Sequence, residues 1–385
     1  MTSDRKVSKN IVIVTHKFLP FPDDDLVLYL NKNKKDNVLH INHYYGRAET
    51  RRSIATWYKH GEVYKIFKSL EALKLPEFII YLKEFLYTLI FVFRSGLKFD
   101  YYIGLDGMCT FFGIFLRSLK KVKKVSYWAM DFVPENRFRS GIKNLIYHKI
   151  NTFGYKNADE MWDLSPRMAD AREEFLGIKK DSYRKHKVVP YGMWFDRIKR
   201  YSYEECEKNT LVFMGHLLEK QGVQLVLEAI PEILKKIPDF RFKVIGTGNY
   251  KGKLEERVKE LKLENHVDFL GKIDRNEDLE EEIAKSCIAI APYIAKLDAW
   301  TKYADPGKVK TYLACGVPVL LTDVPWNAKE IEKMGCGKII KEDPKEVVKK
   351  IIELMDGKIN QKCRDKAEEY SKSFDYVNIF EEIGL

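Results

Sequence analysis

Short apolar runs alternate with longer amphipathic segments along the whole chain. The runs hold few polar positions, which is typical of strands buried on both faces of a parallel sheet. The segments between them repeat apolar residues at helical spacing. In the first half the pattern predicts strands at 11–14, 38–42, 99–104, 125–128, 160–165 and 188–192, and helices at 77–95, 110–119 and 140–157. In the second half it predicts strands at 211–214, 242–245, 267–271, 288–292 and 317–322, and helices at 223–236, 252–262, 279–285 and 308–315.

A polar stretch at 196–210 interrupts this alternation, which then begins afresh. A chain of 385 residues is also too long for a single core. We therefore predict an α/β fold of two Rossmann-like domains, 1–195 and 196–369, with a C-terminal helix at about 370–385 that packs back on the first. Ligands of such sheets bind beyond the carboxyl ends of the strands.

Charge is distributed unevenly between the halves. Residues 1–200 hold 37 Lys+Arg and 22 Asp+Glu, a net charge of +15, so the remainder carries −4 of the total of +11. A half this basic indicates an anionic partner, which could be a phospholipid surface, a lipid phosphate or nucleic acid. The alternative is that the lysines only keep an aromatic-rich domain soluble. Nucleic acid is not expected as a partner, because the basic residues are spread over αβ units without a recognisable reading module.

The cysteines and the apolar runs indicate a cytoplasmic protein. None of the six cysteines forms a C-x-x-C pair, which argues against a zinc site or a disulfide framework and fits a reducing compartment. The basic start is followed by a strand-like run rather than a secretory signal. The longest apolar run, 78–93, is interrupted by Lys83 and Glu84 and is too short to span a bilayer. It predicts a core helix, or alternatively a helix that contacts the membrane surface.

Two connections in the first half carry distinctive residues. The turn 15–25 has no G-x-G-x-x-G pattern and is not expected to cradle a diphosphate. Its aspartates at 23–25 resemble a metal motif formally, but we interpret them as a helix N-terminus. The connection 43–60 is predicted to be a loop that contacts headgroups or an acceptor, or else a plain surface loop. Its basic and aromatic members include Arg47, Arg51, Arg52 and Trp57.

The stretch 302–325 predicts a polar loop, a short helix, a glycine stop and a strand. Asp305 stands at the expected N-cap. Lys308 and Lys310 lie near the start of the helix, where they suit an anionic ligand at the mouth of a parallel sheet. The alternative is an ordinary αβ unit with solvated lysines.

Five motifs in the second half occur in an order that resembles the retaining nucleotide-sugar glycosyltransferases of the GT-B fold, family 4. They are Gly215-His216-x3-Lys220-x-Gly222, Val244-Ile245-Gly246-x-Gly248, Val267-x-Phe269-Leu270-Gly271, Ala291-Pro292-Tyr293 and Lys308-x3-Tyr312-Leu313-Ala314-x-Gly316-x-Pro318-Val319. The resemblance implies two domains that face a central cleft. It also implies transfer of a hexosyl group from a UDP- or GDP-sugar, with retention, to a glycan or glycolipid in cell-surface polysaccharide biosynthesis.

The resemblance assigns the donor to the second domain. It implies that Lys220 and Lys308 hold the diphosphate and that Phe269 and Leu270 read the base. The full set of expected donor-binding residues is Gly215, His216, Lys220, Gly246, Gly248, Phe269, Leu270, Tyr293, Asp305, Lys308, Val309, Thr311 and Tyr312. No cofactor is expected, and a metal is not expected to be required. A peripheral position on the inner face of the membrane is compatible with the basic first half.

The chain departs from the family pattern at several positions. The arginine of the glycine-rich turn is replaced by His216, and its lysine is displaced to Lys220 or replaced by Gln221. The E-x7-E motif is absent, since its second glutamate falls at Thr311, and Asp305 is the nearest carboxylate.

In the first domain, the family's histidine near the reaction centre falls at Met130. Asp131 and Asp106 follow strands and are the candidate groups for deprotonating an acceptor hydroxyl. Because of these departures, the alternative that the protein is a non-catalytic family member acting as a subunit stays open. A GT-B-fold epimerase or phosphorylase is a further alternative.

Overall fold

The computed structural model describes residues 8–17, 22–32, 34, 36–44, 52–71, 76–133, 137–297 and 301–385. The chain forms two compact units. The first comprises Met1–Pro190 together with Phe380–Leu385, and the second comprises Tyr191–Ile379. The division therefore falls at Pro190 rather than at 195, and the returning segment is shorter than the predicted helix at 370–385.

The first unit contains an eight-stranded sheet in the order β4-β3-β2-β1-β5-β6-β7-β8. Its parallel strands are β1 (Asn10–Lys17), β2 (Asn37–Tyr44), β5 (Phe99–Gly104), β6 (Val122–Ala129), β7 (Glu160–Asp163) and β8 (His186–Val188). The edge is an antiparallel hairpin of β3 (Ile54–Lys59) and β4 (Glu62–Lys68).

The prediction of a loop at 43–60 is therefore wrong in its second half, because β3 occupies part of it. Ala55 and Trp57 alternate inward in β3, and the turn residues His60 and Gly61 both have positive φ, as a two-residue hairpin requires. Arg47 and Arg51 lie outside the described residues.

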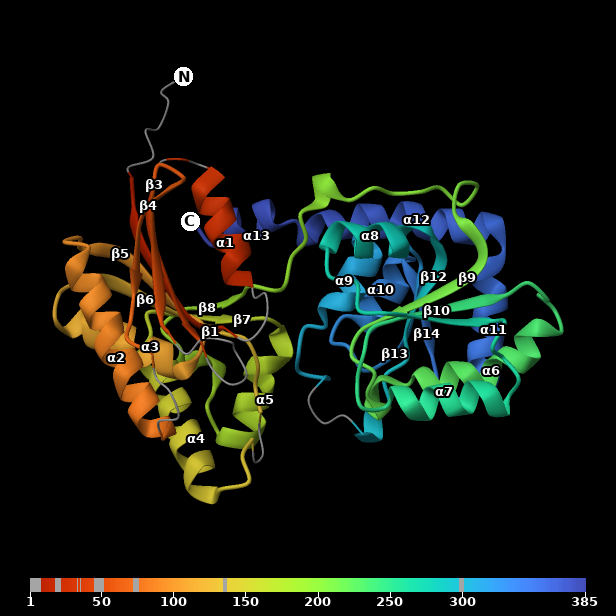
Figure 1. Cartoon of the computed structure of the whole chain (residues 1–385), viewed down its shortest axis with the longest axis horizontal. Coiled ribbons are helices and arrows are strands. Elements are labelled where there is room, and N and C mark those ends of the chain that lie inside the picture. Colours follow the sequence, from red (N-terminus) through yellow and green to blue (C-terminus); the bar gives the residue numbers. More distant parts are fainter. Residues whose placement is uncertain are drawn as a thin grey trace. The chain divides into compact units, whose positions relative to one another are not determined.

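Helices cover both faces of this sheet (Figure 1). Helix α1 (Pro22–Lys32) meets the end of α13 (Tyr376–Glu382) through Tyr29 and Phe380, whose ring centroids are 5.3 Å apart. The other helices of the unit are α2 (Glu77–Arg94), α3 (Gly107–Ser118), α4 (Gly141–Asn157) and α5 (Pro166–Leu176). Val12 and Val14 of β1 share one core with α2 and α3.

The second unit contains a six-stranded parallel sheet in the order β11-β10-β9-β12-β13-β14. Its strands are β9 (Glu207–Met214), β10 (Arg241–Ile245), β11 (Val267–Gly271), β12 (Ser286–Ala291), β13 (Val319–Thr322) and β14 (Gly337–Ile340). Its helices are α6 (Val223–Leu234), α7 (Lys251–Glu260), α8 (Asn276–Lys285), α9 (Gly307–Ala314), α10 (Ala328–Met334), α11 (Pro344–Met355) and α12 (Gly357–Ser371). Short 3₁₀ helices lie at Lys180–Ser182, Phe195–Arg197, Glu219–Gln221, Ala295–Leu297 and Lys372–Phe374.

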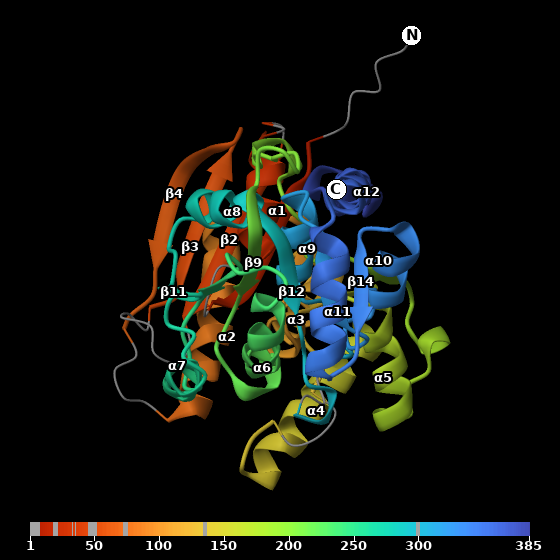
Figure 2. The same cartoon turned by 90° about the vertical axis from the view of Figure 1, so that its right-hand side faces the viewer.

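Alternate residues of the central strand β9 serve two cores in this unit. Phe213 packs with α6, α7 and α11 on one face, whereas Val212 packs with α8, α9 and α10 on the other (Figure 2). Both faces are buried, which explains the continuous apolar runs. The predicted α/β fold with two Rossmann-like sheets is thereby confirmed.

Candidate functional site

Two glycine turns lie against each other at the carboxyl edge of the second sheet. Gly215 follows β9 with a φ of +145°, and Gly246 follows β10 with a φ of +137°. The amide of Gly215 donates to the carbonyl of Ile245 at 2.9 Å, and the amide of Gly246 donates to that of Gly271 at 2.7 Å. A Cβ on Gly246 would stand 1.9 Å from the carbonyl oxygen of Gly215. Only glycine fits there, so the turns form one backbone-lined edge.

The next glycine along extends the same edge. A Cβ on Gly248 would stand 2.2 Å from the carbonyl oxygen of Leu217, whose amide donates to Thr247 at 2.9 Å. Gly248 thus permits close approach of the two turns. The amides of Gly215, Gly246 and Leu217 already donate within the protein, so a phosphate group at this edge would be held by other groups.

Lys308, in the first turn of α9, brings a positive charge to this edge. Its ammonium donates to the side-chain oxygen of Gln221 at 2.5 Å and lies 4.2 Å from the ring centroid of Phe213. A Cβ on Gly215 would stand 2.7 Å from the same nitrogen. The partial positive charge of the helix N-terminus adds to that of the lysine. This is the arrangement expected of an anion site.

Gln221 stands where the family turn was expected to carry a lysine. Its amide oxygen holds the ammonium of Lys308, so a lysine from another element reaches the turn. The backbone of Lys220 accepts a hydrogen bond from Ile294 at 3.0 Å, and the side chain of Lys220 is half-buried.

Several predicted donor residues hold α9 and the sheet edge together. The hydroxyl of Tyr312 accepts a hydrogen bond from the amide of Met214 at 2.7 Å, and Val309 is buried in the core. Tyr293 is also buried, with its ring centroid 5.1 Å from the ammonium of Lys308. Thr311 donates back to the carbonyl of Gly307 at 3.2 Å within the helix.

Three further predicted residues flank the edge. His216 is exposed at the glycine turn. On β11, Phe269 is half-buried against the core and Leu270 is 42% exposed. Leu270 therefore offers an apolar surface beside the strand end, where we predicted contact with the base.

Asp305 has a different place from the one predicted. Pro306, not Asp305, is the N-cap of α9. The buried carboxylate of Asp305 accepts from the ammonium of Lys310 at 2.5 Å, the amide of Tyr191 at 2.8 Å and the indole of Trp326 at 2.9 Å. A sugar hydroxyl would have to share oxygens that already accept hydrogen bonds from the protein.

Lys310 consequently does not join Lys308 at the glycine edge. Its ammonium is buried and donates to Asp305 and to the carbonyl of Tyr191. Burial lowers the pKa of Lys310 in spite of the neighbouring carboxylate. The prediction that both lysines serve an anionic ligand therefore fits Lys308 alone.

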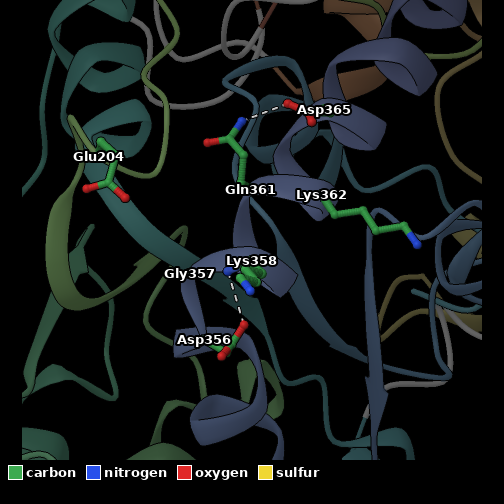
Figure 3. A pocket seen from close by; sticks show the side chains of 7 residues that line it. All are labelled: Glu204, Asp356, Gly357, Lys358, Gln361, Lys362 and Asp365. Carbon is green, nitrogen blue, oxygen red and sulfur yellow. Dashed lines mark hydrogen bonds between the residues drawn. The ribbon is translucent and has the colours of Figure 1, made fainter.

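A polar hollow of about 690 Å³ lies elsewhere in the second unit (Figure 3). It is lined by Glu204 and by residues near the start of α12, where Asp356 accepts from the amide of Lys358 at 3.0 Å. Asn360 in the same turn donates to the carbonyl of Cys287, near the amino end of β12. The hollow thus lies at the opposite end of the strands from the glycine edge.

The first unit holds a charged cluster at the carboxyl ends of β1 and β5. Asp106 caps α3 by accepting from the amide of Cys109 at 2.7 Å, and its other oxygen contacts Nδ1 of His16 at 2.5 Å. Nε2 of His16 lies 3.0 Å from the buried carboxylate of Glu84 on α2. The side chain of Asp106 is 36% exposed, so one carboxylate of the cluster reaches the surface.

The charges in this cluster stabilise one another. Burial opposes the imidazolium form of His16, but Asp106 and Cys109 together, through charge and hydrogen bonds, raise the pKa of His16 well above its usual value. Burial would raise the pKa of Asp106, yet the charge and hydrogen bond of His16 hold it at about 2. Asp106 is therefore a fixed carboxylate, better suited to accepting a hydrogen bond from a hydroxyl than to removing its proton.

Asp131, the other predicted carboxylate, follows β6 and is more exposed. Its side chain is 52% exposed and pairs with Arg137 at 2.7 Å. Sequence reasoning found Asp106 and Asp131 from their positions after strands, but it missed His16 and Glu84. The available signal was the pair of charged residues, Lys83 and Glu84, inside an otherwise apolar run.

Residues 208–357 match the family model described as Glycosyl transferases group 1. An uncharacterized glycosyltransferase of Methanocaldococcus jannaschii is 27% identical over 177 residues, which is 45% of this chain and 46% of that relative. A second from the same organism is 27% identical over 139 residues, 34% of each protein. The chain thus matches less than half the length of these curated relatives.

Solved structures similar to this chain cover nearly all of it. Sucrose-phosphate synthase from Thermosynechococcus elongatus aligns with a TM-score of 0.70 at 14% identity, covering 98% of this chain and 97% of that one. Anabaena HepE in complex with UDP aligns with a TM-score of 0.67 at 14% identity, covering 97% of this chain and 98% of that one. WaaG, a glycosyltransferase involved in lipopolysaccharide biosynthesis, aligns with a TM-score of 0.63 at 14% identity, covering 97% of this chain and 98% of that one. These likenesses confirm the predicted GT-B fold.

Proposed function

We propose, from the GT-B fold and the match of the second unit to glycosyl transferases group 1, that this protein is a glycosyltransferase. In this proposal it transfers a hexosyl group from a UDP- or GDP-sugar to a hydroxyl of a glycan or glycolipid, with retention. The observation that carries the proposal is the ammonium of Lys308 at the two glycine turns. A UDP complex of the structurally similar HepE supports the choice of donor.

The leaving diphosphate is the group that gains charge as the sugar departs. Lys308 and the N-terminus of α9 would stabilise that charge beside the turns at Gly215 and Gly246. Lys220 lies in the same turn and would add a second cation. We propose that these lysines serve the diphosphate without a metal.

The first unit would bind the acceptor. We assign Asp106 to orient the acceptor hydroxyl, because its carboxylate is partly exposed and held ionised by His16. Asp131 is the second candidate, although Arg137 already engages it. A position at the inner face of a membrane fits the basic first half, and a role in surface polysaccharide synthesis fits the involvement of the structurally similar WaaG in lipopolysaccharide biosynthesis.

A non-catalytic subunit is the second candidate function. The absence of a carboxylate at Thr311 and of an arginine at His216 favours it. Such a subunit would bind the donor without turning it over, and this difference decides between the two.

A thermal-shift screen of UDP-, GDP- and CMP-sugars tests the proposal. At about 100 times its Kd the correct donor should stabilise the protein by about 2.7 kcal/mol, which corresponds to about 5–10 °C for a unit of this size. We expect UDP- or GDP-sugars to give this shift and CMP-sugars to give none. Absence of a shift with every UDP- and GDP-sugar would contradict the proposal.

Product analysis follows for the stabilising donor. Release of nucleoside diphosphate with a lipid or oligosaccharide extract as acceptor, and proton NMR of the anomeric centre, test catalysis and retention. Asp106→Asn should slow release more than Asp131→Asn. Binding without release would instead favour the non-catalytic subunit.

A further inference from the structure

Helices α2, α3 and α4 of the first unit turn large apolar side chains outward. On α2, Phe78, Leu82, Leu86 and Ile90 recur every four residues and are 72%, 55%, 48% and 41% exposed. Residues at this spacing lie on one side of a helix. Helix α2 thus has one face in the core, through Phe91 and Val92, and a second apolar face in solvent.

The outward apolar surface continues from α2 onto its neighbours. Phe85 of α2 contacts Phe115 of α3 with ring centroids 5.1 Å apart, and Phe111 of α3 contacts Phe153 of α4 at 5.7 Å. On α4, Ile142 is 73% exposed. The three helices lie together on one side of the sheet (Figure 1). We call the exposed apolar side chains of these helices the α2–α4 face.

An apolar surface of this extent is unusual for a protein face that meets only water. Of the 24 large hydrophobic side chains that are exposed among the described residues, 11 belong to these three helices. Extended apolar surfaces rimmed by polar groups mark docking sites for proteins or membranes. The kind of partner must therefore be read from the charges around the face.

The charges on these helices are mostly positive. The three helices carry six Lys or Arg residues and two Glu residues. Both glutamates have partners, since Glu84 is buried against His16 and Glu77 pairs with Lys143 at 2.8 Å. Helix α4 has lysines at 143, 149 and 156 and no acidic residue. A second copy of this face would meet it with like charge, whereas anionic headgroups complement it.

We propose that the α2–α4 face docks on a membrane that contains anionic phospholipid. Its apolar side chains enter the boundary between headgroups and acyl chains, and the lysines of α4 contact the headgroups, as in amphipathic helices that lie on a bilayer. No helix within the described ranges is long and apolar enough to cross a bilayer, so the contact is with the surface. The inference deepens the proposed function, in that a docked first unit would meet a lipid-linked acceptor at the membrane.

Vesicle co-sedimentation of the full chain tests this docking. We expect sedimentation with phosphatidylcholine vesicles containing about 30% phosphatidylglycerol and at least tenfold weaker partitioning into pure phosphatidylcholine. The apolar variant Phe78→Ser/Leu82→Ser and the charge variant Lys149→Glu/Lys156→Glu should each lower binding at least tenfold. The matched control Met334→Ser/Ile359→Ser removes exposed apolar side chains from the second unit and should bind as wild type.

Three results would overturn the proposal. They are no sedimentation of the wild type with anionic vesicles, unchanged binding by the α2–α4 variants, and a dimer in solution that the apolar variant dissociates. The last result would identify a second copy as the occupant. Thermal shift with UDP on the same preparations separates this outcome from a failure of the proposed transfer, because donor binding requires only the second unit.

Discussion

Lys308→Ala should lower donor turnover about 10²–10³-fold while the protein keeps its fold, because one electrostatic contact to a developing charge typically supplies that factor. The ammonium of Lys308 lies at the glycine turns and adds to the N-terminus of α9. Alanine is a good helix former, so the substitution removes the charge without disturbing the helix. Initial rates of nucleoside diphosphate release measure the effect, and circular dichroism checks the fold.

Lys329→Ala is the matched control for this prediction. Lys329 is 78% exposed on α10 of the same unit and pairs with Asp323 at the surface. Its removal should leave turnover unchanged. If Lys308→Ala turns the donor over as fast as the control does, Lys308 is not part of the site.

Asp305→Ala should lower the free energy of unfolding of the second unit by about 3–5 kcal/mol. The substitution leaves the ammonium of Lys310 buried without its carboxylate and removes the acceptor for the amide of Tyr191 and the indole of Trp326. In this variant Lys310 can release its proton, because burial already lowers its pKa, and this limits the loss of stability. Urea denaturation monitored by tryptophan fluorescence measures the change.

The surface carboxylate Asp323 supplies the comparison. Its pairing with Lys329 is exposed, so Asp323→Ala should change stability by less than about 1 kcal/mol. The double variant Asp305→Leu/Lys310→Met should recover most of the stability lost in Asp305→Ala, since it leaves no charge buried. A small effect of Asp305→Ala would show that the pair contributes little to the fold.

The strands that are buried on both faces were predictable, whereas β14 was not predicted and the strand expected at 188–192 lies at His186–Val188. Ile11–Val14 and Leu211–Phe213 are fully buried. In a chain where short apolar runs alternate with helical segments, an apolar run of that length predicts a strand. The hairpin of β3 and β4 was not predictable in the same way. Most of β4 is exposed, so its sequence has charged residues where a buried strand would be apolar.

The two lysines of α9 show what sequence leaves undetermined in the site. Lys308 and Lys310 are two positions apart, so they point to different sides of the helix. One reaches the glycine turns, and the other reaches Asp305 inside the unit. Which lysine serves which partner depends on how α9 packs on the sheet, and the local sequence does not encode that packing.

The same limit applies to the cluster of the first unit. Asp106 was found because it follows a strand, but His16 and Glu84 lie 90 and 22 positions before it in the chain. Only the pairing of β1 with β5 and the packing of α2 bring the three together. Long-range contacts of this kind require the topology before they can be predicted.

Calorimetric titration of the wild-type protein with UDP, UMP and uridine tests the central claim, that the edge formed by Lys308 and the glycine turns binds a nucleoside diphosphate. Affinity should fall at least tenfold from UDP to UMP and again from UMP to uridine, because the phosphates meet the ammonium and the helix N-terminus. The same series with GDP, GMP and guanosine covers the other base. Equal affinity for diphosphate and nucleoside in both series, or no binding by either diphosphate, would contradict the account.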